Sequence, residues 1–206
     1  PGMVHAKPGM AGDGAQFADG RVRAGGRSMA LADAARDGEL VAEDAIEFGD
    51  LSKRYHQSTF AALYCEGGGD RYTGEPRVRR MLSVCAAGRI LNPKQARSQV
   101  IGAMAMGIGG ALSEELAVDK RFGFFVNHDL AGYEVAVHAD VPHTEVVFLD
   151  EADATSSPMK AKGIGELGLC GVGAAIANAV HNATGVRVRE YPLTLDKLLP
   201  GLPALT

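Results

Sequence analysis

The feature that most constrains the fold is a long helical segment that begins at Asn92. Asn can cap a helix, Pro93 suits the first helical position, and the Gln95 side chain can reach back to the Asn92 amide. Apolar residues then recur about every 3.6 positions, at Ala96, Val100, Ile101, Met104, Ile108, Ala111 and Leu112. We therefore expect one long helix with a single buried face.

Glycines interrupt this helical pattern four times, at Gly102, Gly107, Gly109 and Gly110. A glycine in a helix interior costs about 1 kcal/mol relative to alanine. The pattern therefore indicates that a sheet or a ligand approaches the helix backbone closely.

The part of the chain before this helix is expected to form hairpins after a flexible lead-in over residues 1–15. Asp19-Gly20 between apolar residues predicts a tight hairpin turn, and a short helix is expected over residues 31–36, ended by Gly38. A second hairpin is predicted from strands 58–66 and 77–85, with turns at 67–70 and 73–76.

The part after the helix is expected to mix strands and helices. Strands are predicted over residues 124–126, 133–137, 145–149 and 185–191, and helices over 172–182, stopped by Gly185, and 194–199. The strand at 145–149 has the most buried pattern, and a polar loop over 150–160 follows it. The fold class expected is α+β, a mixed or mostly antiparallel sheet with packed helices.

Composition excludes several classes of protein. The 206 residues are 46% hydrophobic and 22% charged, with a net charge of -4, so a basic face for nucleic acid or an anionic membrane is not expected. No apolar run is long enough to span a bilayer, and no signal-peptide pattern begins the chain. Three distant cysteines indicate no disulfide framework or iron-sulfur site, and His128, His138 and His143 lack the helical spacing of a zinc pair.

A glycine-rich segment at Gly163–Gly168 matches G-x-G-x-x-G, with Glu190 roughly 20 residues beyond it. A Rossmann-like dinucleotide-binding module is therefore one alternative. Two observations oppose it. A polar loop containing Pro158 separates the preceding strand from Gly163, and the Glu166 carboxylate would compete with a pyrophosphate for the same amides.

Glu166 itself admits two interpretations from spacing alone. Ile164 and Leu167 flank it, and partial burial between them would raise the pKa of its carboxyl toward neutrality, as a general base requires. Alternatively, Glu166 caps the helix that begins near Gly171. The nearby Lys160 and Lys162 are expected to be solvated, with a cofactor phosphate or Glu166 as alternative partners.

Three long runs of sequence carry a family resemblance. They are GRILNPKQARSQVIGAMAMGIGGALSEE (88–115), FGFFVNHDLAGYEVAVHADVPHTEVVFLD (122–150) and KAKGIGELGLCGVGAAIANAVHNATGVRVREYPLTLDKLLP (160–200). In this order they resemble the C-terminal part of the large subunit of molybdenum hydroxylases, particularly bacterial aldehyde oxidoreductases of the xanthine dehydrogenase family. The resemblance implies the C-terminal portion of a molybdopterin-binding domain over residues 45–206, after a loosely matched lead-in over 1–44.

The resemblance also implies roles for particular residues. Glu166 would be the catalytic base that activates a molybdenum-bound hydroxide, with water as the source of the oxygen added to an aldehyde or N-heteroaromatic substrate. Gln99 and Gly102 would contact the molybdopterin cofactor, in its cytosine dinucleotide form. The backbone of Gly163, Gly165 and Gly168 would lie beside it.

The partners implied are an iron-sulfur subunit with a 2Fe-2S cluster, an FAD subunit, and the remainder of the large subunit. The compartment implied is the bacterial cytoplasm, or the periplasm if a partner subunit carries an export signal. The family's large subunit is several times longer than this chain. We therefore expect the chain alone to hold no molybdenum and to be inactive, and a non-catalytic assembly role is a further alternative.

Overall fold

The computed structural model describes residues 16–34, 36 and 50–203. The chain divides into two compact units, Pro1–Asp50 and Leu51–Thr206. The expected lead-in over 1–15, the helix stop at Gly38 and the domain boundary expected after residue 44 lie outside the described residues.

The N-terminal unit contains a small antiparallel sheet. Its strands are β1 (Gln16–Ala18), β2 (Arg21–Ala24) and β3 (Arg27–Ala30), and the short helix α2 (Leu31–Ala34) follows. Asp19 and Gly20 have positive φ values of 51° and 68°, which a two-residue hairpin turn requires. The Asp-Gly turn therefore joins two antiparallel strands, as its sequence predicts.

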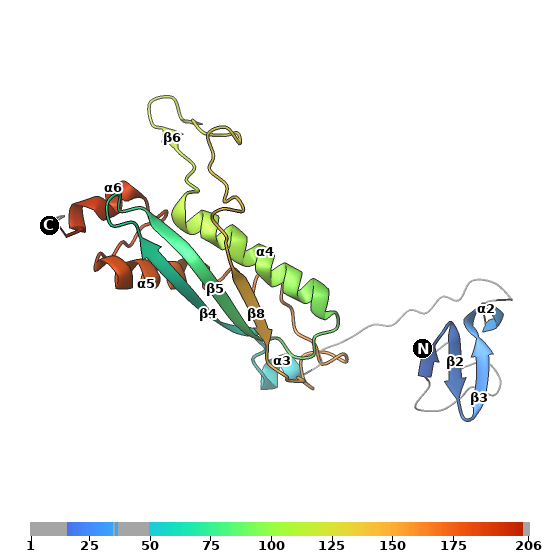
Figure 1. Ribbon diagram of the computed structural model, residues 1–206. Helices are drawn as coiled ribbons and strands as arrows, with labels where there is room; N and C mark the ends of the chain where they lie inside the picture. Colours follow the sequence, from blue (N-terminus) through green and yellow to red (C-terminus); the bar gives the residue numbers. More distant parts are fainter. Residues whose placement is uncertain (1–15, 35, 37–49, 204–206) are drawn as a thin grey trace. The chain divides into compact units, whose positions relative to one another are not determined.

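The C-terminal unit is built on a three-stranded mixed sheet (Figure 1). After the short helix α3 (Leu51–Arg54), β4 (Phe60–Gly69) and β5 (Pro76–Ala86) form an antiparallel pair. Strand β8 (Thr144–Phe148) joins β5 in parallel, so the order is β4-β5-β8. The expected α+β fold with a mixed sheet is confirmed.

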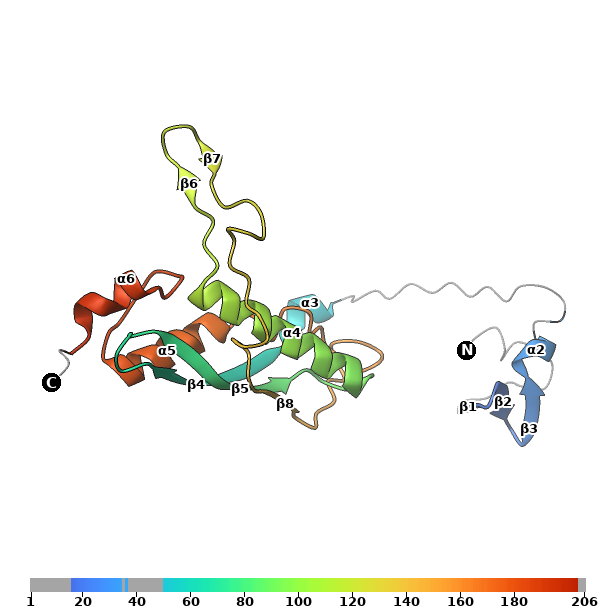
Figure 2. The ribbon, with the colours of Figure 1, turned by 45° about the horizontal axis from the view of Figure 1, so that its top comes forward.

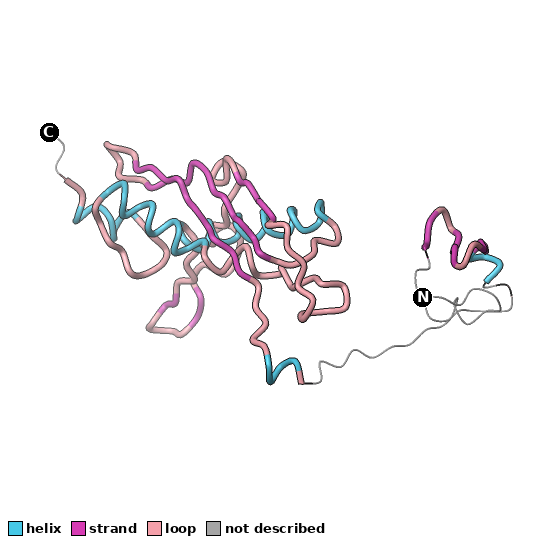
Figure 3. The backbone as a smooth tube through the Cα atoms, turned by 90° about the horizontal axis from the view of Figure 1, so that it is seen from below, coloured by secondary structure: helices cyan, strands magenta, loops and turns pink. Residues whose placement is uncertain are grey.

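Two helices, α4 (Pro93–Leu112) and α5 (Val172–Thr184), share one apolar core with the sheet (Figures 1 and 3). The core side chains come from both helices, the sheet and the C-terminal segment: Val78, Met81, Cys85, Val100, Met104, Ile108, Ala111, Val146, Val172, Ile176, Val180, Leu193 and Leu198. Phe60, Tyr64 and Val147 of the strands are exposed. Helix α6 (Leu195–Leu198) and a 3-10 turn (Leu199–Gly201) complete the unit.

The start of α4 and the end of α5 lie where the sequence predicts them. The Asn92 side chain accepts a hydrogen bond from the Gln95 amide at 3.1 Å and caps α4. Helix α5 ends at Gly185, whose φ of 76° is left-handed and whose amide donates to His181. Within α4, a Cβ at Gly107 would lie 2.6 Å from Val172, so this glycine lets α5 approach.

An arm projects from the end of α4 away from the sheet (Figure 2). It contains the short strands β6 (Val118–Asp119) and β7 (Phe124–Phe125). The strand predicted at 133–137 is wrong, because the chain is irregular there, between turns at 131–132 and 138–140. The side chain of Asp129 accepts the amides of Ala131 and Gly132, and that of Asp140 accepts the Val137 amide, which replaces strand pairing with local hydrogen bonds.

Three further predictions differ from the structure. The turn expected at 67–70 is wrong, because β4 continues to Gly69 with an irregularity after Glu66, and the turn begins at Asp70. The strand expected at 185–191 is also wrong. That segment packs Val186 and Val188 on the core instead of pairing with a sheet edge. In β8 only Val146 is buried, because β8 lies at an edge of the described sheet.

Candidate functional site

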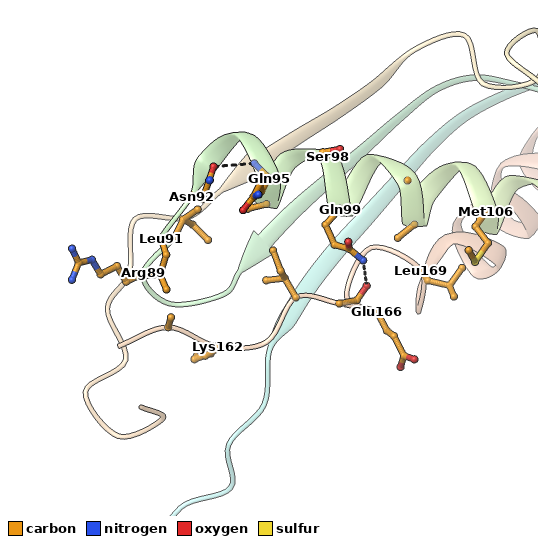
Figure 4. Close-up of a pocket in the computed structure, with 17 residues that line it drawn as sticks. Arg89, Leu91, Asn92, Gln95, Ser98, Gln99, Met106, Lys162, Glu166 and Leu169 are labelled. Atoms are coloured by element: carbon orange, nitrogen blue, oxygen red, sulfur yellow. Dashed lines mark hydrogen bonds between the residues drawn. The ribbon is translucent and has the colours of Figure 1, made fainter. Parts of the chain in front are cut away.

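A groove of about 1060 Å³ lies along the N-terminal half of α4 (Figure 4). Three segments line it: the turn before α4, the exposed side of α4 itself, and the glycine-rich loop that precedes α5. The lining residues are Arg89, Ile90, Leu91, Asn92, Gln95, Ala96, Ser98, Gln99, Gly102, Ala103, Met106, Ala161, Lys162, Ile164, Gly165, Glu166 and Leu169. The tertiary fold therefore brings the two motifs singled out in the sequence, Gln99-x-x-Gly102 and the segment around Glu166, to one groove.

The glycine-rich loop is held by hydrogen bonds to three separate segments. The Lys162 amide donates to the Ala87 carbonyl at 3.0 Å, beside the end of β5. The Thr59 hydroxyl donates to the Gly163 carbonyl at 2.7 Å, and the Gln99 side-chain amide donates to the Gly165 carbonyl at 2.8 Å. These bonds fix the backbone immediately before Glu166.

The Glu166 side chain is exposed at this groove and extends away from α4 (Figure 4). Within the described part of the chain its carboxylate makes no hydrogen bond, whereas its carbonyl accepts from the Leu169 and Cys170 amides. Gly171 caps α5 without any side-chain hydrogen bond. The capping interpretation of Glu166 is therefore wrong, and the expected partial burial of its side chain does not occur in this chain.

The other candidate residues divide into two groups. Gln99, Gly102 and Gly165 line the groove together with Glu166, while Gly163 and Gly168 do not. A Cβ at Gly168 would lie 2.8 Å from the Val100 carbonyl and 3.0 Å from the Ala103 Cβ. Gly168 therefore has a packing role, because it lets the loop lie directly on α4.

An ion cluster lies at the start of the same loop, and sequence reasoning missed it. The Lys162 ammonium is 3.0 Å from a Glu151 carboxylate oxygen and 3.5 Å from an Asp153 carboxylate oxygen. The expectation that Lys162 is solvated is therefore wrong, since only 14% of its side chain is exposed, and of the two partners considered from the sequence, Glu166 and a cofactor phosphate, Glu166 is not the one it contacts. The sequence feature that could have predicted this cluster is the presence of Glu151 and Asp153 in the polar loop before Lys162, because a short loop can fold back and bring such charges together.

The hydrogen bonds of this cluster shift three pKa values. The Gly88 amide, followed by Lys162, lowers the pKa of the Glu151 carboxyl. The Thr155 hydroxyl and amide lower the pKa of Asp153, with a smaller contribution from Lys162. The hydrogen bond to Glu151 is the main cause that raises the pKa of Lys162.

We expect the stabilisation by this cluster to be confined to a pH window. The lowered pKa values make the carboxylate contributions complete above about pH 4 and lost as the pH falls through the lowered values. The raised Lys162 pKa makes its contribution complete below about pH 10 and lost as the pH rises through the raised value. The free energy of unfolding of wild type and Lys162→Met, measured across pH, should differ most between about pH 5 and 10. A difference in the free energy of unfolding that stays equally large in strong acid would contradict this prediction.

The dinucleotide-binding alternative is contradicted by the structure. A dinucleotide fingerprint follows directly on a strand, but β8 ends at Phe148, and between it and Gly163 the chain forms irregular loop and turns with one isolated bridge at Ala161. Residues 165–170 are turns, and α5 begins only after Gly171.

Other candidate groups are not assembled into sites. Cys65, Cys85 and Cys170 are free thiols, and burial raises the pKa of Cys65 to about 11. The described residues contain no group of three or more His, Cys, Asp or Glu side chains placed to hold a metal ion. Over the same ranges, no helix is both long enough and apolar enough to cross a membrane.

Comparison with known proteins identifies the family. The family model of the molybdopterin cofactor-binding domain matches residues 4–142, more than half of the chain. The chain belongs to this family. It is 67% identical over 201 residues to the aldehyde oxidoreductase molybdenum-binding subunit PaoC of Escherichia coli K12, an alignment that covers 98% of this chain and 28% of PaoC.

Two further proteins are similar to the molybdopterin-binding chain. It is 36% identical over 163 residues to the putative xanthine dehydrogenase molybdenum-binding subunit XdhA of E. coli K12, covering 79% of this chain and 21% of XdhA. The solved aldehyde oxidoreductase of Desulfovibrio desulfuricans superposes with a TM-score of 0.63 and 29% identity, covering 70% of this chain and 16% of that one. The chain thus spans about a quarter of the length of the relatives it matches.

The groove of the molybdopterin-binding chain has the features that a bound pterin cofactor requires. A Cβ at Gly102 or Gly165 would meet no other atom within 4 Å, so a bound group can lie directly on the backbone there. Among the described residues that line the groove, Glu166 alone carries a carboxylate and Arg89 is cationic, while the Lys162 ammonium is paired with Glu151 and Asp153. Neutral amides and a guanidinium suit a phosphate-bearing ligand, so these residues fit the cofactor.

Proposed function

We propose that this chain forms one wall of the active site of a molybdenum hydroxylase that oxidises aldehydes. The observation that carries the proposal is the groove in which Gln99, Gly102 and Glu166 meet. The 67% identity to an aldehyde oxidoreductase subunit favours aldehydes over N-heteroaromatic substrates. In this reaction an aldehyde and water give a carboxylic acid, two protons and two electrons.

Glu166 acts as the general base in this proposal. When bound, the molybdenum cofactor supplies two-electron oxidation and the activation of water. The Glu166 carboxylate accepts the proton of the water-derived nucleophile, and two features of the chain support this role. Its oxygens have no hydrogen-bond partner in the described structure. The hydrogen bonds to the Gly163 and Gly165 carbonyls hold the backbone before Glu166 and so fix the position of its Cα atom.

In this proposal, Gln99, Gly102 and Gly165 bind the cofactor. The Gln99 side chain uses one N–H for the Gly165 carbonyl, which leaves its second N–H and its oxygen for the cofactor. Gly102 and Gly165 allow the ligand to approach the backbone. The cytosine dinucleotide form of molybdopterin is the form that we propose.

The electrons leave through a 2Fe-2S cluster and FAD on partner subunits, and the rest of the large subunit supplies the other walls of the pocket. PaoC and XdhA are both named as molybdenum-binding subunits, which supports a multisubunit enzyme. A purely structural assembly role is less consistent with the site, because Glu166 is exposed beside a groove instead of buried against protein.

The experiment that tests this function uses the intact complex purified with its partner subunits. We expect molybdenum in stoichiometric amount with the chain by elemental analysis. Oxidation of an aromatic aldehyde in ¹⁸O-labelled water should place the label in the carboxylic acid product, with an artificial electron acceptor taking up the electrons. A complex that lacks molybdenum, or that oxidises neither aldehydes nor N-heteroaromatics, would refute the proposal.

Gly102→Ala tests the cofactor contact separately from folding. Gly102 and Gly110 both lie on α4 with no atom within 4 Å of an added Cβ, but only Gly102 lines the groove. Each alanine should stabilise the helix by up to about 1 kcal/mol. We expect Gly102→Ala to lower the molybdenum content of the complex several-fold and Gly110→Ala to leave it unchanged. Equal molybdenum contents would remove Gly102 from the cofactor site.

A further inference from the structure

The ion cluster of Lys162, Glu151 and Asp153 has no part in the reaction proposed above. Its side chains are largely withdrawn from solvent, with 14%, 33% and 24% of their surfaces exposed, respectively. A single Glu151 oxygen accepts from both the Lys162 ammonium at 3.0 Å and the Gly88 amide at 2.6 Å. Ion pairs that are partly buried and share such hydrogen bonds are far better defined in geometry than exposed surface pairs.

The cluster joins three segments of the chain, one of which, at Lys162, lines the groove. Glu151 and Asp153 belong to the polar loop after β8, and Gly88 lies in the turn after β5. Backbone hydrogen bonds reinforce the junction, since the Arg89 amide donates to the Lys160 carbonyl at 2.8 Å and the Lys162 amide donates to the Ala87 carbonyl at 3.0 Å. Lys162 is thus the residue at which the loop carrying Glu166 leaves the body of the unit.

This loop needs such an anchor. Two of the three residues between Lys162 and Glu166 are Gly163 and Gly165, and glycine has more backbone freedom than any other residue. A general base must be held within about 0.5 Å of its productive position, and an error of about 1 Å can lower a rate about 100-fold. Thr59 and Gln99 each hold one carbonyl beyond Lys162, so the anchor at Lys162 is the third fixed point.

We propose that Lys162, through its ion pairs with Glu151 and Asp153, is a positioning residue for Glu166. The proposal rests on the base role proposed above for Glu166. Lys162 lines the groove, but its ammonium is engaged by the carboxylates of Glu151 and Asp153. The Glu166 carboxylate extends away from α4 (Figure 4). Its role is to hold the backbone that carries the base.

The test compares variants of the intact complex for kcat, KM and molybdenum content. Lys162→Met should lower kcat about 10- to 100-fold, with KM and molybdenum content unchanged. Lys162→Arg should keep most of the wild-type kcat, because arginine can form both ion pairs. Lys160→Met is the matched control, since Lys160 lies in the same loop, is exposed and does not line the groove. It should behave as wild type.

A double mutant separates positioning from general stability. If Lys162 acts through Glu166, Lys162→Met should cause no further loss of residual turnover in a Glu166→Gln background. A multiplicative loss, a loss of molybdenum from Lys162→Met, or a wild-type kcat for Lys162→Met would each overturn the positioning role. If Lys162→Met cannot be purified, Glu151→Gln weakens the same ion pair and should lower kcat similarly, and a wild-type kcat for it would also overturn the proposal. A normal kcat for Glu166→Gln would instead refute the base assignment.

Discussion

Glu166→Gln should lower kcat of the intact enzyme by about 10²- to 10⁴-fold while its molybdenum content stays at the wild-type level. Glutamine preserves the size of the side chain but cannot accept the proton of the nucleophile. The change should not unfold the loop, because the Glu166 carboxylate makes no hydrogen bond within the described residues, and the loop is held by the Gly163 and Gly165 carbonyls. Steady-state turnover of an aldehyde, with elemental analysis of the same preparation, measures both quantities.

Glu190→Gln is the matched control for this substitution. Glu190 is also an exposed glutamate, and it does not line the groove. It is the acid that a dinucleotide-binding interpretation would have used, so its replacement should leave turnover unchanged. A Glu166→Gln enzyme with near-normal turnover, or one that has lost its molybdenum, would contradict the assignment of Glu166 as the base.

Gly88→Ala should lower the free energy of unfolding of this chain by roughly 2 to 4 kcal/mol. Gly88 has a left-handed φ of 64°, which is unfavourable for alanine. In addition, a Cβ there would lie 2.6 Å from the Lys160 carbonyl oxygen, which is a backbone atom and cannot rotate away. The methyl group would push apart the turn after β5 and the loop that begins at Lys160, so kcat should fall as well.

Gly123→Ala distinguishes the two causes in this prediction. Gly123 has a similar φ of 73°, but an added Cβ there would meet no atom within 4 Å. Gly123→Ala should therefore lower the free energy of unfolding by only about 1 kcal/mol, the cost of the left-handed conformation alone. Urea unfolding of both variants measures the difference, and equal losses would show that the close contact at Gly88 has no effect.

The elements that were predicted correctly depend on residues close together in the chain. Asn92 and Gln95 begin α4, Gly185 ends α5, and Asp19-Gly20 forms a hairpin turn. Each of these signals involves contacts within one turn of the chain, and the free energy of such contacts is largely independent of what packs nearby.

The predicted strands that did not form depend on distant partners. The segments at 133–137 and 185–191 are rich in Val and Tyr, which favour strands, but a strand needs an edge to pair with. In one segment Asp140 takes up a backbone amide, and in the other the apolar side chains pack on the core. The sequence pattern records which side chains favour a strand, but not whether an edge is available.

For the site, the sequence and its family resemblance indicated the residues that we propose to carry the chemistry, namely Glu166 with its carboxylate and Gln99 with its amide. Only the tertiary structure decided how they are held. The bonds that fix the Glu166 loop join residues 66 and 104 positions apart, and the bond from Gly88 to Glu151 spans 63. Such contacts exist only after β5, β8 and α4 have packed, because local preferences contain no information about which distant segments will meet.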